Sequence, residues 1–427
     1  MLKAIRTLLG KTNNIERSSY IWNSINAIVA ACQCPVILMV MTRTNGVHDA
    51  GVFSIAFAVA SLMMYIGLYG LRKFQASDVN EKFTFSEYHG TRIVTCFVMI
   101  IVCIGYCIYG GIFKAYDTEK FIVILMVCGI RVIQSYTDVI HGRMQQKGRL
   151  DVATKASAIR YFSEVAAYAV MLILTHDLLI SSTFCFMISI IVMLLTTVNA
   201  GQDYCDMSFS MDAQKLKPLL IEGFPIFVSL FLNMYISNAP KYAIDTYLTE
   251  EIQAIYNLIF MPAFMVGLLA NFIFNPILTS YAKVWLDNEI SRFKKLIKKQ
   301  CLVIAGITAA GLIVAATIGT PILSIIFGID LNMYRAELCV VMLGGGMLAY
   351  TTFFSTVITI IRMQRTLLIS YGVVALAALA LSGFLVTNYG IMGAAVMYAA
   401  LMMILSVILM IIVVCKIRKE ELTLYRQ

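Results

Sequence analysis

Apolar runs of roughly 18 to 25 residues recur along the whole chain, and they leave few folds open to it. Each run is long enough to cross the hydrocarbon core of a bilayer as an α-helix, which takes about 20 apolar residues. The runs do not alternate polar and apolar residues, as the strands of a membrane barrel do. Backbone polar groups inside lipid must be satisfied within the segment. The sequence therefore predicts an all-α polytopic membrane protein.

About twelve such runs are present, at the length that a membrane span requires. They lie approximately at residues 21–41, 51–71, 91–113, 121–140, 156–174, 179–198, 219–237, 254–275, 302–318, 338–361, 367–386 and 391–414. The composition agrees, because 60% of residues are hydrophobic and 13% are charged. An ordinary soluble domain has about 25% charged residues, so this chain is expected to need lipid around it.

A polar stretch divides the predicted spans into two groups of six. It begins at Asp203-Tyr204-Cys205-Asp206 and ends at Lys217-Pro218. Transporters built from two parallel halves have this organisation. We predict an N-terminal lobe at 1–200 with the first six spans, a cytoplasmic linker at 201–218 and a C-terminal lobe at 219–427 with the last six.

The distribution of basic residues predicts the orientation. Most of the 33 Lys and Arg residues fall near the chain ends or in every second predicted loop, which is typical of cytoplasmic segments. Both termini are therefore expected in the cytoplasm. The basic segments that orient the chain and contact anionic headgroups account for the net charge of +9. No nucleic-acid partner is therefore expected. The opposite side has few basic residues: Arg43, Lys114, Lys120, Lys241 and Arg335.

The sequence contains no recognisable motif for catalysis or metal binding. Most of the 11 cysteines lie in apolar runs, and the four histidines are scattered, so we expect no metal and no cofactor. The predicted outer loops are short, which argues against a membrane enzyme that polymerises or ligates glycans. The triple glycine at 344–346 lies inside an apolar run and favours close helix packing. The protein is not expected to be an enzyme.

Ionisable residues at membrane depth are the main candidates for a site, because each costs roughly 2.5 to 3.5 kcal/mol to insert. Lys241 and Asp245 lie one helical turn apart after the seventh run, where they are expected at the mouth of the helix. Pro240 is expected to interrupt the helix just before them, and such breaks concentrate where a cavity is lined. The alternative is a local ion pair that caps a helix end beside water.

Arg131 and Arg160 lie within the fourth and fifth runs and have two interpretations. They could contact an anionic substrate. Alternatively, at about 1.5 Å of rise per residue, Arg131 and Glu164 lie at similar depth, as do Asp138 and Arg160. Antiparallel packing of the two helices would then form two structural ion pairs, Arg131 with Glu164 and Asp138 with Arg160.

Four segments resemble one known family. They are Arg72-Lys73-Phe74-Gln75-Ala76-Ser77-Asp78, Gly148-Arg149-Leu150-Asp151, Asn238 to Asp245, and Tyr256-Asn257-Leu258-Ile259-Phe260-Met261-Pro262. They look like Wzx-like flippases for lipid-linked oligosaccharides, which are polysaccharide biosynthesis proteins of the multidrug/oligosaccharidyl-lipid/polysaccharide exporter superfamily. The resemblance implies a V-shaped fold of two facing six-helix lobes, similar to that of the MATE transporters, around a cavity that opens alternately to each side.

The resemblance also implies a substrate and a setting. The substrate would be a polyprenyl-pyrophosphate-linked oligosaccharide for capsule, O-antigen or another surface polysaccharide, carried across a bacterial plasma membrane. Membrane lipid and polysaccharide assembly proteins would be the other partners. A cation-coupled multidrug exporter of the same superfamily is the alternative. Such exporters commonly use an acidic residue in the first span, whereas residues 21–41 contain neither Asp nor Glu.

This substrate assigns expected roles to the polar residues of the spans. A pyrophosphate needs cationic donors along its route, and the sugars need a wet polar cavity. Asparagines one turn apart on the first and eighth runs are expected to line that cavity. The expected substrate-binding residues are Lys241, Asp245, Arg131, Arg160, Asn23, Asn26, Asn271 and Asn275, with Arg43 at the outer end of the first span assisting release.

Overall fold

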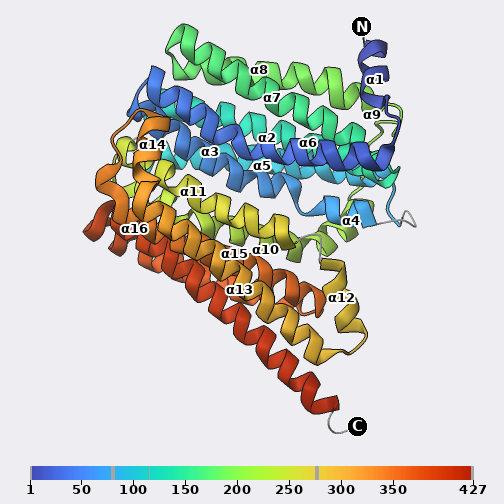
Figure 1. Cartoon of the computed structure of the whole chain (residues 1–427). Helices are drawn as coiled ribbons and strands as arrows, with labels where there is room; N and C mark the ends of the chain where they lie inside the picture. The colour runs from blue at the N-terminus through green and yellow to red at the C-terminus, as the bar shows by residue number, and fades with distance from the viewer. Residues whose placement is uncertain (1, 78–81, 115, 275–277, 425–427) are drawn as a thin grey trace. The chain divides into compact units, whose positions relative to one another are not determined.

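The computed structural model describes residues 2–77, 82–114, 116–274 and 278–424 (Figure 1). This part of the chain contains helices and turns and no β-strand. The chain forms two compact units, unit 1 at Met1–Phe231 and unit 2 at Leu232–Gln427. The boundary lies inside one long helix, α10 (Ala213–Tyr247). The predicted all-α class is confirmed.

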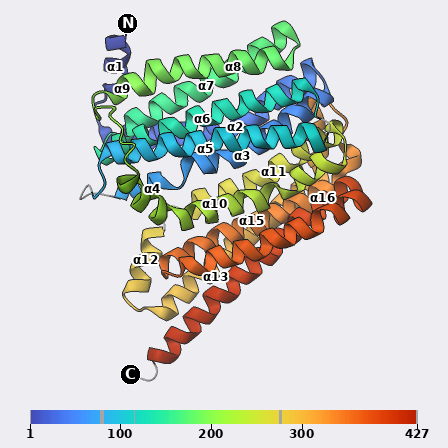
Figure 2. The ribbon, with the colours of Figure 1, turned by 180° about the vertical axis from the view of Figure 1, so that it is seen from behind.

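Unit 1 is built around α3 and α6, its two most buried spans. Helix α6 packs against α3, α5 and α8, whereas α7 packs chiefly against α2 and α8. The long helices run side by side, as Figures 1 and 2 show. The elements are α1 (Leu2–Gly10), α2 (Ile15–Thr44), α3 (Val47–Leu68), α4 (Leu71–Ser77), α5 (Phe85–Phe113), α6 (Thr118–Gln146), α7 (Leu150–Thr175), α8 (Leu178–Met193), a π-helical turn (Leu194–Val198), α9 (Asn199–Gly201) and the first part of α10 (Ala213–Tyr247).

Unit 2 has α15 at its centre, packed against α11, α13 and α16. A Cβ added at Gly344 would lie 2.4 Å from the ring of Tyr398, and one at Gly345 would lie 2.6 Å from the carbonyl oxygen of Ala263. The interpretation of the triple glycine as a close-packing feature is confirmed. The elements are the rest of α10, α11 (Glu250–Phe274), α12 (Leu278–Leu286), α13 (Ile290–Val314), a π-helical turn (Ala315–Gly319), α14 (Thr320–Phe327), a 3₁₀ turn (Asn332–Tyr334), α15 (Arg335–Ile360) and α16 (Gln364–Leu424).

Ten helices in the described part of the chain are long and apolar enough to cross a membrane. Helix α16 has 61 residues and contains the last two predicted runs. Gly390, with φ 54° and ψ −131°, breaks its helical backbone between them, in a conformation that suits glycine. Helix α11 covers the predicted run at 254–275 up to Phe274. The ten helices hold eleven of the predicted runs, because α16 holds two, and α11 holds the twelfth; the chain is a multi-pass membrane protein.

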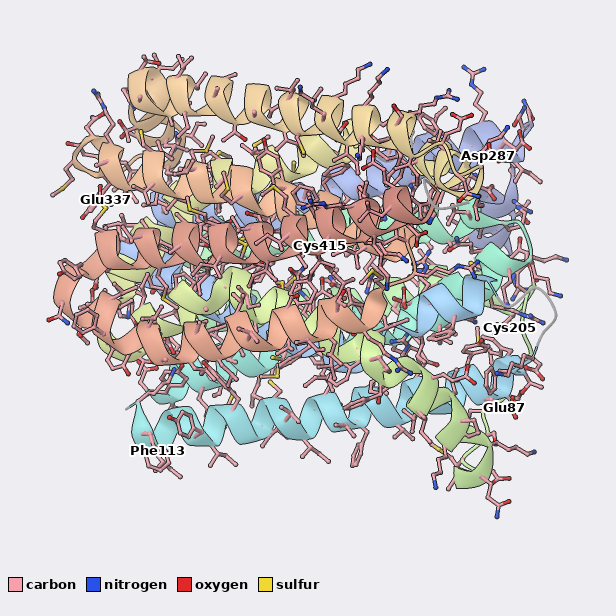
Figure 3. All side chains as sticks on the ribbon, turned by 90° about the horizontal axis from the view of Figure 1, so that it is seen from below. Glu87, Phe113, Cys205, Asp287, Glu337 and Cys415 are labelled. Carbon is pink, nitrogen blue, oxygen red and sulfur yellow. The ribbon has the colours of Figure 1, made fainter. Side chains whose placement is uncertain are left out.

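The residues labelled in Figure 3 identify the two ends of the helices in each unit. In unit 1, Glu87 and Cys205 lie at one end of the helices and Phe113 at the other; in unit 2, Asp287 and Glu337 lie at opposite ends. We call the Glu87 end of unit 1 its basic end, because α1 and the basic residues that contact it lie there.

A buried carboxylate at the basic end fastens α1 to the unit. Asp151 is fully buried and accepts from Arg149 Nε at 2.9 Å, with Lys155 Nζ 3.6 Å away. Lys155 Nζ also donates to the Leu9 carbonyl at 3.1 Å, and Arg149 Nη2 donates to the Gly10 carbonyl at 2.8 Å. These cations satisfy the free carbonyls of α1 and complement its dipole. The Gly148-Arg149-Leu150-Asp151 segment therefore has a structural function.

Candidate functional site

A buried polar cluster lies among the spans of unit 1, and we call it the Glu164 cluster. Its members come from four helices: Gln33 of α2, Arg131 and Gln134 of α6, Arg160 and Glu164 of α7, and Ser189 of α8. Glu164 is 1% exposed. It accepts hydrogen bonds from Gln33 Nε2 at 2.6 Å, Gln134 Nε2 at 3.3 Å and Ser189 Oγ at 2.6 Å. Three donors thus hold the carboxylate in place.

Arg131 reaches this carboxylate through the two glutamines. Its Nη1 donates to Gln33 Oε1 at 3.4 Å and to Gln134 Oε1. Its guanidinium carbon lies 4.3 Å from the centre of the Phe57 ring, which adds a cation–π contact. The predicted link between Arg131 and Glu164 is therefore a hydrogen-bonded relay through amides and not a direct ion pair.

Arg160 is the least satisfied member of the cluster. It is 1% exposed, and its Nε lies 3.9 Å from Glu164 Oε1, which is beyond hydrogen-bond distance. Its Nε and Nη1 are buried and form no hydrogen bond in the described part of the chain. Buried N–H groups are usually bonded. The Nε groups of other arginines, such as Arg6 and Arg92, are also without a hydrogen bond, but among the arginines of the described residues Arg160 alone has two such groups. Two arginines share one carboxylate, which leaves the cluster with a net positive charge.

The predicted pair between Asp138 and Arg160 is wrong. Asp138 instead accepts from Arg92 Nη2 at 2.8 Å and from Arg72 Nη1 at 3.0 Å. The prediction assumed antiparallel packing of α6 and α7 that brings residues of equal depth together. In the structure the partners of Asp138 lie on α4 and α5, while α7 packs chiefly against α2 and α8.

A small cavity of about 20 Å³ borders the Glu164 cluster. Gln33, Arg131 and Glu164 line it together with apolar and aromatic side chains, including Phe57 and Tyr168. Its volume suffices for about one water molecule, and its lining offers polar partners for one. The cluster therefore has room for a small polar group beside its charges.

In unit 2, α10 carries the second candidate site. Lys241 and Asp245 are 8% and 7% exposed, and they lie one turn apart. Lys241 Nζ lies 4.3 Å from the centre of the Phe260 ring. Tyr235 and Tyr242, on the same helix, stack with their ring centres 5.9 Å apart. This places a buried cation and an aromatic pair on one segment of α10.

One expectation about this segment is wrong. Helix α10 continues through Pro240 to Tyr247, so the proline does not interrupt it. Proline removes one backbone donor, and membrane helices accommodate that loss through their neighbours. Lys241 and Asp245 lie in the last two turns of α10, at the end of the helix where they were expected, and both are buried.

The remaining predicted residues are distributed along α2 and α11. Asn23 is exposed on α2, Asn26 is half-buried one turn later, and Arg43 is exposed near the end of the same helix. Asn26 Oδ1 is itself buried and forms no hydrogen bond in the described part of the chain. The side chain of Asn271 and the whole of Asn275 lie outside the described residues.

Several polar residues of unit 1 were missed by sequence reasoning. Gln33, Gln134 and Ser189 complete the Glu164 cluster, and the two amides inside apolar runs were the available signal, because a buried amide needs partners. Arg92, near the start of the predicted run at 91–113, was not considered as a site residue. It is fully buried in α5, where it also donates to the Gly67 carbonyl.

Groups outside the spans at the basic end have altered acidity. The hydrogen bond that Arg149 donates to Asp151 raises the pKa of the Arg149 guanidinium above its ordinary value. Burial raises the pKa of the Cys205 thiol to about 11. Arg149 therefore stays charged against Asp151, and Cys205 stays protonated at neutral pH.

Comparison with known proteins identifies the fold. No family model matches the chain. The capsular polysaccharide biosynthesis protein CapF of Staphylococcus aureus is 20% identical over 379 residues, which cover 87% of this chain and 92% of that protein. A distant sequence relative therefore spans most of both chains.

Two solved structures match over nearly the whole chain. An inward-facing multidrug resistance MATE family transporter of the MOP superfamily matches with a TM-score of 0.67 at 13% identity, covering 95% of this chain and 99% of that one. The lipid II flippase MurJ in an inward closed conformation matches with a TM-score of 0.67 at 13% identity, covering 93% and 90%. This protein therefore has the fold of the MOP-superfamily transporters.

Proposed function

We propose that this protein is a flippase that moves polyprenyl-pyrophosphate-linked oligosaccharide units across a bacterial plasma membrane by alternating access. The product would serve the synthesis of capsule, O-antigen or another surface polysaccharide. The observation that carries the proposal is the net positive Glu164 cluster, in which Arg160 keeps two buried N–H groups without hydrogen bonds. The fold of MurJ and the distant likeness to CapF support the same class of substrate.

The proposed topology follows the sequence. Lobes at 1–200 and 219–427 are joined by a linker at 201–218, and both termini and the basic end of unit 1 face the cytoplasm. The charge bias of the loops supports this orientation. Polysaccharide assembly proteins are proposed partners at the membrane.

The chemistry of the substrate matches the candidate residues. A pyrophosphate leaving water needs several charge-assisted hydrogen bonds, and a guanidinium supplies them in a fixed geometry. Arg160 has donors to spare, and Lys241 adds a second buried cation in unit 2. Neither residue needs to change a covalent bond, so the proposed activity is transport and not catalysis of a reaction.

A cation-coupled multidrug exporter is the second candidate, because the MATE transporter matches the fold as well as MurJ does. The Glu164 carboxylate is the buried acid that such a pump would require. Three hydrogen bonds and two arginines already surround it, however. A cationic drug at this cluster would meet a net positive charge, which argues against the exporter.

The test is accumulation of lipid-linked oligosaccharide on the cytoplasmic leaflet of a strain that lacks this protein. Native protein is expected to clear the accumulated lipid, whereas Lys241→Met and Arg131→Met are not, at equal membrane abundance. Lys298→Met is the matched control, since Lys298 is exposed on α13. No accumulation in the deletion strain, together with a gain in drug sensitivity, would replace the flippase by the exporter.

A further inference from the structure

A hollow of about 490 Å³ lies between α5 and the start of α10, near the basic end of unit 1. We call it the α5–α10 groove. Apolar side chains such as Val94, Met211, Leu220 and Phe224 line it. Among the described residues of its lining, Lys217 alone is charged, and its side chain is exposed. The groove is separate from the residues of the Glu164 cluster.

One wall of the groove is fixed by close packing of Tyr69 on α10. Tyr69 ends α3 in the left-handed conformation, with φ 48°, and its ring stacks on that of Phe227 at 4.8 Å. A Cβ added at Gly223 would lie 3.0 Å from the Tyr69 ring, so the glycine permits this approach. The wall therefore has a defined position.

The linker before Met211 is fixed in turn to α5. Ser210 N donates to the Ser86 carbonyl at 2.9 Å. A Cβ added at Gly90 would lie 1.8 Å from the Ser210 carbonyl oxygen, so only glycine lets the linker lie this close. His89 holds the same linker two residues earlier, where its Nδ1 lies 2.9 Å from the Ser208 carbonyl oxygen. The groove is thus a built feature of unit 1 and not a loose surface depression.

The lining specifies the chemistry of an occupant. The volume lies within the range of about 300 to 1,000 Å³ that is typical of small-molecule sites. An apolar channel suits a hydrocarbon chain, and a lone ammonium at its edge suits a phosphate. Both features together fit one amphipathic anion, whose chain lies in the groove and whose phosphate lies at Lys217.

We propose that the α5–α10 groove docks the isoprenoid chain of the polyprenyl-phosphate-linked substrate, with Lys217 against its phosphate. This inference rests on the proposed function, since it takes the lipid-linked substrate as given. It adds a loading position near the basic end, used before the headgroup reaches the buried cations. The chain would stay in contact with lipid, while the polar headgroup is recognised elsewhere.

The experiment is photolabelling of the full chain in lipid nanodiscs with a polyprenyl phosphate that carries a diazirine in its isoprenoid chain, followed by peptide mapping. Labels are expected on Val94 and within residues 211–224, with loss of the label when unmodified polyprenyl phosphate is added in excess. Lys217→Gln is expected to reduce labelling about tenfold, and Ala213→Trp, which fills the groove, is expected to abolish it. Lys215→Gln is the matched control and leaves labelling unchanged.

Three outcomes would overturn the proposal. Labels confined to other segments would exclude the groove. Equal competition by phosphatidylglycerol would make it a general lipid site, and equal labelling by a polyprenol without phosphate would remove the role of Lys217. The readout is independent of flipping: labelling of the groove in a protein whose deletion causes no accumulation would refute the flippase alone. Accumulation without labelling would refute the groove alone.

Discussion

Replacement of Arg160 by methionine separates a structural from a functional role for the Glu164 cluster. Methionine keeps most of the apolar length of arginine and removes its charge. Arg160 contributes no hydrogen bond through Nε or Nη1, and its distance to Glu164 is 3.9 Å. Glu164 keeps its three donors, and Arg131 remains linked to it through Gln33 and Gln134. The variant should therefore fold while losing one buried cation.

The magnitude follows from two opposing effects. A buried donor without a partner costs about 1 to 3 kcal/mol, and Arg160 has two such groups. Removing them offsets the lost attraction to Glu164, so the net change in the free energy of unfolding should lie within about 1 to 2 kcal/mol. Glu164→Gln is different, because it leaves both arginines without a carboxylate. Breaking a buried ion pair in this way costs about 3 to 5 kcal/mol.

Thermal unfolding of the purified proteins, beside flipping in proteoliposomes, is the assay. With about 2 to 4 °C per kcal/mol for a domain of this size, Glu164→Gln should lower Tm by on the order of 10 °C. Arg160→Met should stay within a few degrees of the native protein and lose flipping. The double variant Arg160→Met/Glu164→Gln should recover much of the lost Tm, since it restores the net charge of the cluster. A fall in Tm for Arg160→Met as large as for Glu164→Gln would refute the reasoning, and normal flipping by a stable Arg160→Met would exclude Arg160 as a substrate contact.

Three further predictions concern the basic end of unit 1. Asp151→Asn leaves Arg149 and Lys155 without their carboxylate, so amide hydrogen exchange in Leu2–Gly10 should accelerate at least about tenfold. Asp212→Asn, at an exposed site, is the control and should leave this exchange unchanged. Unchanged exchange in both variants would contradict the role of Asp151. Gly90→Ala should displace the linker, because the new Cβ meets the Ser210 carbonyl at 1.8 Å; faster proteolysis between 203 and 212 measures this, and Gly105→Ala, which has open space, is the control. Cys205, with its pKa raised to about 11, stays a protonated thiol at neutral pH, so its alkylation rate should rise about tenfold per pH unit from pH 7 to 9; a plateau below pH 9 would show that burial does not control it.

The helices could be predicted because a bilayer imposes a length on each span. That constraint acts on the run itself and needs no knowledge of neighbours. The break at Gly390 illustrates this: the last two runs were predicted as separate spans, and the helical backbone of α16 is broken between them. The effect of Pro240 was overestimated, because the loss of one backbone donor is tolerated inside a packed helix.

The polar contacts were harder to predict, because the sequence gives depth along a helix and not the identity of the neighbouring face. Equal depth along the helices was enough to predict that Arg131 and Glu164 are linked, and the structure joins them through Gln33 and Gln134. Equal depth did not identify the partner of Asp138, because several arginines lie at a similar depth. Asp138 pairs with Arg72 and Arg92 of the adjacent helices. Amides inside apolar runs would have been the better guide, since each must find a partner within the bundle.

The charge of the Glu164 cluster is the strongest physical argument between the two candidate functions. Two unit charges 4 Å apart interact by about 4 kcal/mol at the effective dielectric constant of about 20 that suits protein sites. One uncompensated cation in the cluster would thus stabilise a bound anionic group and destabilise a bound cationic group by several kcal/mol. The affinities of the cluster for the two groups would then differ by more than about a thousandfold. Glu164 cannot reverse this preference, because its oxygens already accept three hydrogen bonds and its Oε1 lies 3.9 Å from Arg160 Nε. The carboxylate is also linked to Arg131 through Gln33 and Gln134. A buried site that repels cations suits a phosphate-bearing lipid and is a poor binding site for a cationic drug.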